Sequence, residues 1–348
     1  MIINSKDDKN RKSNTHYRAI LSATLVLLAV VFIAAISVGR YSINFSTTIK
    51  ILPSNIFPIK PDWDGKTAAV IMTLRLPRSI AAILIGGALA LSGSCYQSIF
   101  KNPMVSPDIL GVSSGACVGA ALAILLDLNS FYIQIFAFIC GIITVFLTTL
   151  IPRIIQNDGT TVLVLSGVIM SSLMSSIMSI IKYMADTDTK LAEITYWMMG
   201  SLASIGISDI VPMLPTLLIP AAIILAMRFR LNVMSLGDRE AQSLGIDLRK
   251  TRGIFVICAT LLTASCVCLA GTIGWVGLVI PHISRFLTGA DHKKMLPVAM
   301  LSGSIFMLFI DTLCRTLSSA ELKIGILTGI IGAPFFFFIL FKQRKTIS

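Results

Sequence analysis

The sequence predicts an all-α, polytopic membrane protein with about ten transmembrane helices. Hydrophobic residues make up 55% of the 348 residues and charged residues only 13%, whereas about a quarter of a soluble domain is usually charged. About 20 apolar residues in a helix cross the ~30 Å hydrocarbon layer of a bilayer, and the sequence contains many such runs. Lipid-facing helices in one membrane domain explain both observations.

Ten apolar runs are long enough, or nearly long enough, to form the predicted spans. The eighth run is short and contains Pro281, which favours a partial or tilted crossing. The stretch 193–204 is too short to cross, and its Tyr196 and Trp197 are typical of a helix at the membrane interface. The expected spans are 19–39, 77–100, 108–127, 131–151, 161–182, 208–228, 253–271, 275–288, 295–314 and 324–341.

The distribution of positive charge predicts that both chain termini lie in the cytoplasm. With ten spans the termini share one side, and nearly two thirds of the 29 lysines and arginines then fall on inner segments. The first apolar run is longer than a signal-peptide core of about 7–15 residues, so we read it as an uncleaved span. We expect a cytoplasmic segment at 1–18, a single membrane domain at 19–342 and a cytoplasmic tail at 343–348. This topology explains the net charge of +12, so no nucleic-acid partner is expected.

An internal repeat predicts two halves of opposite orientation. The repeat pairs Leu91 with Leu269, Gly93 with Gly271, Pro103 with Pro281, Ser106 with Ser284 and Gly111 with Gly289. The common offset covers an odd number of expected spans, so the second half would be inverted in the membrane. Inverted pseudo-repeats of this kind recur in transporter folds.

One face of the fifth expected span carries small and hydroxyl side chains. They are Gly167, Ser171, Ser172, Ser175, Ser176 and Ser179. Small residues let membrane helices approach closely, and serine hydroxyls can bond their own helix backbone. The same pattern is also expected of a wet, weakly polar pathway lining, and both interpretations stay open.

The predicted spans contain almost no charged side chain near the bilayer centre. A charge there costs about 2.5–3.5 kcal/mol on insertion scales, so it persists mainly where function requires it. Asp311 is the only carboxylate that we place well inside an apolar run, and Arg315 follows one turn later as an expected ion-pair partner. This pattern argues against an ion-coupled transporter.

The sequence offers no constellation typical of an enzyme or a metal site. The three histidines lack metal-ligand spacing, and the seven cysteines mostly lie inside apolar runs without a CxxC pair. Gly65, Lys66 and Thr67 resemble the end of a phosphate-binding loop, but Lys60 stands where that motif requires glycine. We expect no catalytic residue, no metal and no ATPase site, so any pumping would need energy from a partner.

The segment at about 233–252, between the sixth and seventh spans, is the predicted docking place for such a partner. Asp238 is placed to begin a short helix and Gly245 to end it as a C-cap. We therefore expect a two-turn helix that lies across the cytoplasmic face.

A collinear series of short motifs runs from about residue 70 to residue 342. The motifs are Arg75 to Arg78, Leu91 with Gly93, Gln97, Asn102 with Pro103, Gly111 to Gly115, Tyr196 to Gly200, Gly237 to Ala241, Leu244 with Gly245, Gly277 to His282 and Gly332 to Pro334. This series resembles the FecCD-type permeases of ABC importers for iron siderophores, haem and cobalamin.

The resemblance implies the permease subunit of an ATP-driven importer in the cell membrane of a prokaryote. It implies a permease homodimer, or a pair with a close paralogue, two cytoplasmic ATPase subunits that bind the ATP, and an extracytoplasmic substrate-binding protein. A ferric siderophore or similar metal chelate is the expected cargo, with haem, cobalamin and molybdate as alternatives. An ion-coupled secondary transporter is the alternative from a different class.

The resemblance also assigns roles to individual residues. Arg75, Arg78 and Arg315 match arginines that meet acidic residues on the two lobes of the binding protein. Thr160 and Thr161 resemble a cytoplasmic narrowing of the pathway, which would continue along the hydroxyl face of the fifth span. The residues that resemble the ATPase-coupling helix are Gly237, Asp238, Glu240, Ala241, Leu244 and Gly245.

Overall fold

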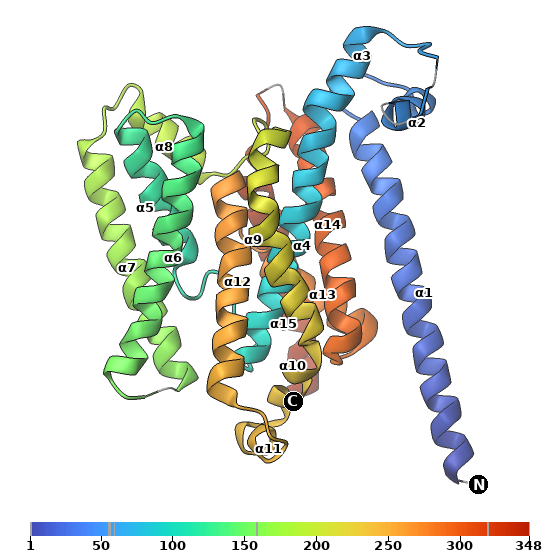
Figure 1. Ribbon diagram of the computed structural model, residues 1–348, viewed down its shortest axis with the longest axis vertical. Coiled ribbons are helices and arrows are strands. Elements are labelled where there is room, and N and C mark those ends of the chain that lie inside the picture. Colours follow the sequence, from blue (N-terminus) through green and yellow to red (C-terminus); the bar gives the residue numbers. More distant parts are fainter. Residues whose placement is uncertain (1, 55–56, 59, 158, 319, 348) are drawn as a thin grey trace.

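The computed structural model describes residues 2–54, 57–58, 60–157, 159–318 and 320–347, and within these ranges the chain is helical without a strand (Figure 1). In the described part of the chain, seven helices are long and apolar enough to cross a membrane, and three shorter apolar helices accompany them. Together they match the predicted number of spans. The main helices are α1 (Ile2–Ser37), α4 (Leu76–Ile99), α5 (Val112–Leu125), α6 (Ser130–Ile154), α7 (Thr160–Met184), α9 (Ile207–Ala226), α12 (Leu248–Ala270), α13 (Val276–Thr288), α14 (His292–Leu317) and α15 (Ile324–Ile347).

Six short elements connect these helices or extend them. They are α2 (Phe45–Ser54), α3 (Gly65–Ala69), the π-helical segment η1 (Val70–Arg75), α8 (Lys190–Met198), α10 (Arg228–Leu236) and α11 (Asp238–Ser243). The expected interfacial helix at 193–204 is thus present as α8, but it ends earlier, where Gly200 adopts a left-handed φ of 73°. The second span also begins earlier than expected, because α3 and η1 continue into α4 as one apolar helical stretch from Gly65 to Ile99.

The third and eighth spans are incomplete helices. Helix α5 has 14 residues and α13 has 13, which gives about 20 Å of length each and falls short of the hydrocarbon layer. Irregular segments precede both helices, at 101–111 and at 271–275. Non-helical backbone at membrane depth is tolerated where it is buried in protein or lines a water-filled cavity.

The two halves of the chain run in opposite directions. Helix α4 descends from α3 toward the side of the molecule that holds α11, and α12 leaves α11 and runs the other way (Figure 1). Two residue pairs of the predicted repeat nevertheless differ in local structure. Pro103 and Ser106 lie in an irregular loop, whereas Pro281 and Ser284 lie inside α13.

Helix α4 forms the centre of the packing, against α12, α13 and α14. Two of its glycines allow backbone contact with neighbouring helices. A Cβ atom at Gly86 would lie 2.2 Å from the carbonyl oxygen of Gly303, and one at Gly93 would lie 1.8 Å from that of Gly277. Close approach of this kind is how membrane helices gain packing energy without a hydrophobic drive between them.

Helix α1 stands at the edge of the bundle, where it contacts mainly α14, and it begins on the same side as α15 ends (Figure 1). The shared side agrees with an even number of crossings. The expected cytoplasmic segment 1–18 is not a separate element, because α1 is helical from Ile2 and continues into the first span.

Candidate functional site

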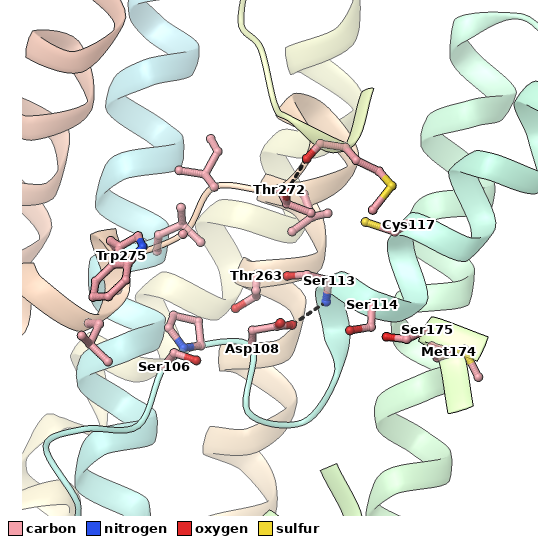
Figure 2. Close-up of a pocket in the computed structure, with 18 of the residues that line it drawn as sticks. Ser106, Asp108, Ser113, Ser114, Cys117, Met174, Ser175, Thr263, Thr272 and Trp275 are labelled. Atoms are coloured by element: carbon pink, nitrogen blue, oxygen red, sulfur yellow. Dashed lines mark hydrogen bonds between the residues drawn. The ribbon is translucent and has the colours of Figure 1, made fainter. Parts of the chain in front are cut away.

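A cavity of about 820 Å³ lies where the two incomplete helices begin. Its walls come from the loop at 101–111, the start of α5, one side of α7, α12 and the loop at 271–275 (Figure 2). Its polar lining consists of Ser106, Asp108, Ser113, Ser114, Ser175, Ser179, Lys182, Thr263 and Thr272. The cavity thus follows from the two helix breaks, since a continuous helix at either place would fill this space.

Asp108 caps the helix that begins at the cavity. The backbone N–H of Ser113 donates to Asp108 Oδ1 at 2.7 Å, and Gly111 turns the chain into α5 with a left-handed φ of 80° (Figure 2). The free N–H groups and the dipole of a helix N-terminus favour a negative charge there. The sequence analysis treated Asp108 only as the first residue of a span and missed this carboxylate.

Residues of the predicted hydroxyl face on α7 divide between two environments. Ser175 and Ser179 line the cavity, whereas Ser172 and Ser176 are exposed on a different part of the helix surface. Ser176 Oγ donates to the Ser172 carbonyl at 3.1 Å, and Ser179 Oγ donates to the Ser175 carbonyl at 2.9 Å. The hydroxyl protons of Ser176 and Ser179 therefore bond to their own helix backbone.

The other predicted pathway residues lie away from the cavity. Gly167 is buried at a helix contact, where a Cβ atom would lie 2.0 Å from the carbonyl oxygen of Ile109. Thr160 and Thr161 are the first residues of α7, on the side of the molecule that holds α11, and Thr161 is exposed. A role for these three residues in the pathway stays a prediction.

Three arginines predicted to lie at the outer face are largely buried in this structure. Arg75, Arg78 and Arg315 are 6%, 7% and 7% exposed. Arg75 donates to the carbonyl oxygens of Ile36 at 2.7 Å and Ser37 at 2.8 Å, where α1 ends. Carbonyl groups at a helix C-terminus lack partners in their own helix, so Arg75 closes the end of α1.

The other two arginines share one buried carboxylate. Arg78 Nε lies 2.7 Å from Asp311 Oδ1, and Arg315 Nε lies 3.1 Å from Asp311 Oδ2. The predicted pair of Asp311 and Arg315 is therefore present, with Arg78 as an additional partner. Arg78 also lies 2.9 Å from Glu321, whose side chain is 36% exposed and is the most accessible member of this cluster. Docking of an external protein by the arginines stays a prediction, and it would require an exchange of these internal partners.

The short helix α11 has the ends that the sequence predicted. Gly245 adopts a left-handed φ of 79°. Its N–H donates to the Gln242 carbonyl at 2.9 Å, and the N–H of Ile246 donates to the Ala241 carbonyl at 3.0 Å. These two bonds form a Schellman motif, which satisfies the last carbonyl groups of a helix. Ala241 is buried, whereas the side chain of Leu244 is 63% exposed. Helix α11 therefore presents an accessible face away from the bundle.

Asp238 fixes α11 to two parts of the membrane domain. Its carboxylate accepts hydrogen bonds from Lys101 Nζ at 2.8 Å and from Arg252 at 3.3 Å. The hydrogen bond from Lys101 lowers the pKa of the Asp238 carboxyl, so the group stays ionised at neutral pH. Lys101 opens the loop that reaches Asp108, and Arg252 belongs to α12, so α11 is tied to both cavity walls.

Known proteins with similar sequences are permeases of import systems. The chain is 36% identical over 329 residues to the molybdate import system permease protein MolB of Haemophilus influenzae, and the alignment covers 94% of this chain and 97% of the relative. It is 32% identical over 345 residues to the hemin transport system permease protein HmuU of Yersinia pestis, covering 95% and 98%. It is 37% identical over 277 residues to the cobalamin import system permease protein BtuC of Halobacterium salinarum, covering 79% and 74%.

The fold has a close counterpart among solved structures. A protein described as a metal-chelate type ABC transporter in an inward-facing conformation superposes with a TM-score of 0.84 and 36% sequence identity, covering 93% of this chain and 99% of that one. The sequence profile of the FecCD transport family matches residues 27–342. The chain therefore belongs to the FecCD transport family and is a multi-pass membrane permease of an ABC importer.

Proposed function

We propose that the chain imports a ferric siderophore or a similar metal chelate, driven by ATP hydrolysis in partner subunits. The size of the cavity supports a chelate. A space of about 820 Å³ lies in the range of pockets that enclose drug-sized ligands, about 300–1,000 Å³. A tetrahedral oxyanion such as molybdate has only five heavy atoms and would leave most of that space to water. Haem and cobalamin are the alternative cargoes of suitable size.

The active unit is proposed to contain two permease copies, as a homodimer or with a paralogue. Support comes from α7, whose surface beyond the cavity exposes Leu173, Ile180 and Tyr183 at 49%, 59% and 91%. Ser172 and Ser176 are exposed among these apolar side chains. Small hydroxyl residues within an apolar helix face are typical of helix–helix contacts in membranes. A second copy across α7 would close the open side of the cavity.

Helix α11 is proposed to receive the ATPase subunits, one per permease. The helix projects from the bundle and exposes Glu240 and the adjoining Leu244. Its backbone geometry depends on Gly237, Asp238, Ala241 and Gly245. Glu240→Arg should leave the assembled complex intact and uncouple it. We expect ATP hydrolysis to continue while uptake falls, because a reversed charge displaces the projection in its groove. Wild-type uptake by this variant would contradict the assignment.

Binding-protein docking is proposed for the outer surface around Arg75, Arg78 and Arg315. Glu321 already supplies Arg78 with a carboxylate at the rim of this surface. An acidic residue of the binding protein would take the place of Glu321, so docking would exchange one carboxylate partner of Arg78 for another. The planar guanidinium group suits such an exchange because it can bind a carboxylate through two parallel hydrogen bonds.

Reconstitution tests the proposal directly. Proteoliposomes would contain the permease and its ATPase subunits, with the binding protein on the outer side and iron-labelled chelate as the cargo. We expect uptake only with ATP on the side of α11 and with the binding protein present. Uptake driven by a proton or sodium gradient without ATP would instead support an ion-coupled carrier. Uptake of molybdate but of no chelate would overturn the proposed cargo.

A further inference from the structure

The cavity contains one carboxylate and one ammonium group, set at different depths. Among the described residues that line it, only Asp108 and Lys182 carry formal charges. Lys182 lies two helical turns beyond Ser175 along α7, toward α8, which places it about 10 Å further along the helix axis. A molecule that enters from the α8 side therefore meets the ammonium group first and the carboxylate deeper in the cavity.

The charge of Asp108 has no cationic partner within the described ranges. Its Oδ1 accepts from the Ser113 N–H at 2.7 Å (Figure 2), and the carboxyl group also forms a hydrogen bond with the Ser113 side chain. Nearby lining groups are the hydroxyls of Ser106, Ser114 and Thr263. Hydroxyl groups can donate or accept as required, so Asp108 is the one ionisable group among the described residues at this end of the cavity.

The capping role alone does not account for an acidic side chain at this position. Asparagine and serine cap helices about as well as aspartate does, and neither carries a charge. An ionised group at membrane depth is costly and usually marks a functional position. The carboxyl group also lines the cavity, where a cargo can contact it.

We propose that Asp108 is a specificity-determining contact that selects the cargo by charge. The carboxylate disfavours oxyanions and anionic chelates, and it favours metal chelates that are neutral or cationic and that present N–H donors, as ferric trihydroxamates with amide or ammonium groups do. Because α5 holds the carboxylate by its backbone, the group cannot turn away from an anion. This inference rests on the proposed function, since it assumes that the cavity belongs to the import pathway.

The cavity contains a reporter of its own for a test. Trp275 lies in the cavity wall (Figure 2), and the sequence contains three tryptophans. Replacement of Trp63 and Trp197 by phenylalanine leaves Trp275 as the single tryptophan of the permease chain, and the ATPase subunits would be prepared without tryptophan. The full complex with its ATPase subunits would be titrated in nanodiscs with two coloured quenchers, a monocationic ferric trihydroxamate and a trianionic ferric tris-catecholate. Molybdate would be added as a competitor against the trihydroxamate.

We expect the wild-type cavity to bind the cationic chelate more tightly than the anionic one, and Asp108→Asn to lower that preference about tenfold or more. Asparagine retains an oxygen that can accept from Ser113, so the start of α5 is preserved, which thermal unfolding of the variant can confirm. Asp186→Asn is the matched control, because it removes the same charge from an exposed turn outside the cavity. It should leave the preference unchanged.

Two results would overturn the inference. An equal preference in wild type and Asp108→Asn, with Trp275 quenched in both, would show that Asp108 does not select by charge. Absence of quenching with and without ATP, in a complex that still imports the chelate, would remove the cavity from the pathway. Loss of ATP-dependent uptake of every chelate by the wild-type complex is a different result, because it refutes the proposed function itself.

Discussion

Replacement of Asp311 by asparagine should destabilise the membrane domain, because this carboxylate neutralises two buried arginines. The Asp311 side chain is 1% exposed and lies 2.7 Å from Arg78 and 3.1 Å from Arg315. The two arginine side chains are only 9% and 8% exposed. Neither guanidinium group can turn to water when Asp311 loses its charge, so the variant leaves excess positive charge in a low-dielectric environment.

The expected magnitude follows from the partners that remain. Removal of one member of a buried ion pair typically costs about 3–5 kcal/mol. Arg78 keeps Glu321 at 2.9 Å, and Arg315 keeps the carbonyl oxygen of Ala35 at 2.8 Å. Asparagine also keeps one oxygen acceptor. We therefore expect the lower end of the range, about 3 kcal/mol, which corresponds to a fall of about 4 °C in the unfolding temperature of a chain of this size.

Exposure of buried thiols during heating provides the assay. Six of the seven cysteines are buried in the bundle and none forms a disulfide, so a thiol-reactive fluorophore reports unfolding in nanodiscs. Asp62→Asn is the control, because Asp62 forms an ion pair with Lys50 at the surface and its side chain is 57% exposed. The control should unfold at the wild-type temperature. An unchanged midpoint for Asp311→Asn would refute the view that these arginines depend on it.

Two further predictions concern the proposed docking places for the ATPase subunit and for the binding protein. Lys101→Gln removes the shorter of the two hydrogen bonds to Asp238. Uptake into proteoliposomes should then fall several-fold while ATP hydrolysis persists. A parallel loss of uptake and ATP hydrolysis would indicate misfolding instead of uncoupling. Glu321→Gln removes the internal carboxylate that competes for Arg78, so the binding protein should bind a few times more tightly, as surface titration would measure. Weaker binding by this variant would show that Glu321 itself contacts the partner.

The sequence was sufficient to locate nearly all membrane helices, because lipid imposes a simple rule on them. Every lipid-facing segment needs an apolar run of sufficient length, and the expected spans at 131–151 and 161–182 lie inside α6 and α7. The glycine at the end of α11 was equally predictable, because positive φ at Gly245 is a local requirement that glycine satisfies without strain.

The contents of the cavity were less predictable, because they depend on a chain that enters the membrane without being helical. Hydropathy alone placed the start of a span at residue 108, whereas α5 begins at Val112 after an irregular approach. Two features of the sequence could have indicated such a loop. Prolines flank Ser106 at Pro103 and Pro107, and an acidic residue stands beside an apolar run. The partners of Arg75 lie at the end of α1 and just beyond it, and they could not be read from local sequence.

The position of Asp238 links the two proposed functional regions of the permease. Its carboxylate contacts Lys101, where the loop toward Asp108 starts, and Arg252, near the start of α12. Helix α12 is the most thoroughly buried long helix, with 78% of its apolar window covered, and its later residues Thr263 and Val267 line the cavity. A buried helix moves as a rigid rod because its neighbours are close-packed. We infer that a displacement of α11 by an ATPase subunit shifts the Asp108 loop and α12 together, and that this shared movement is what couples ATP hydrolysis to the cavity.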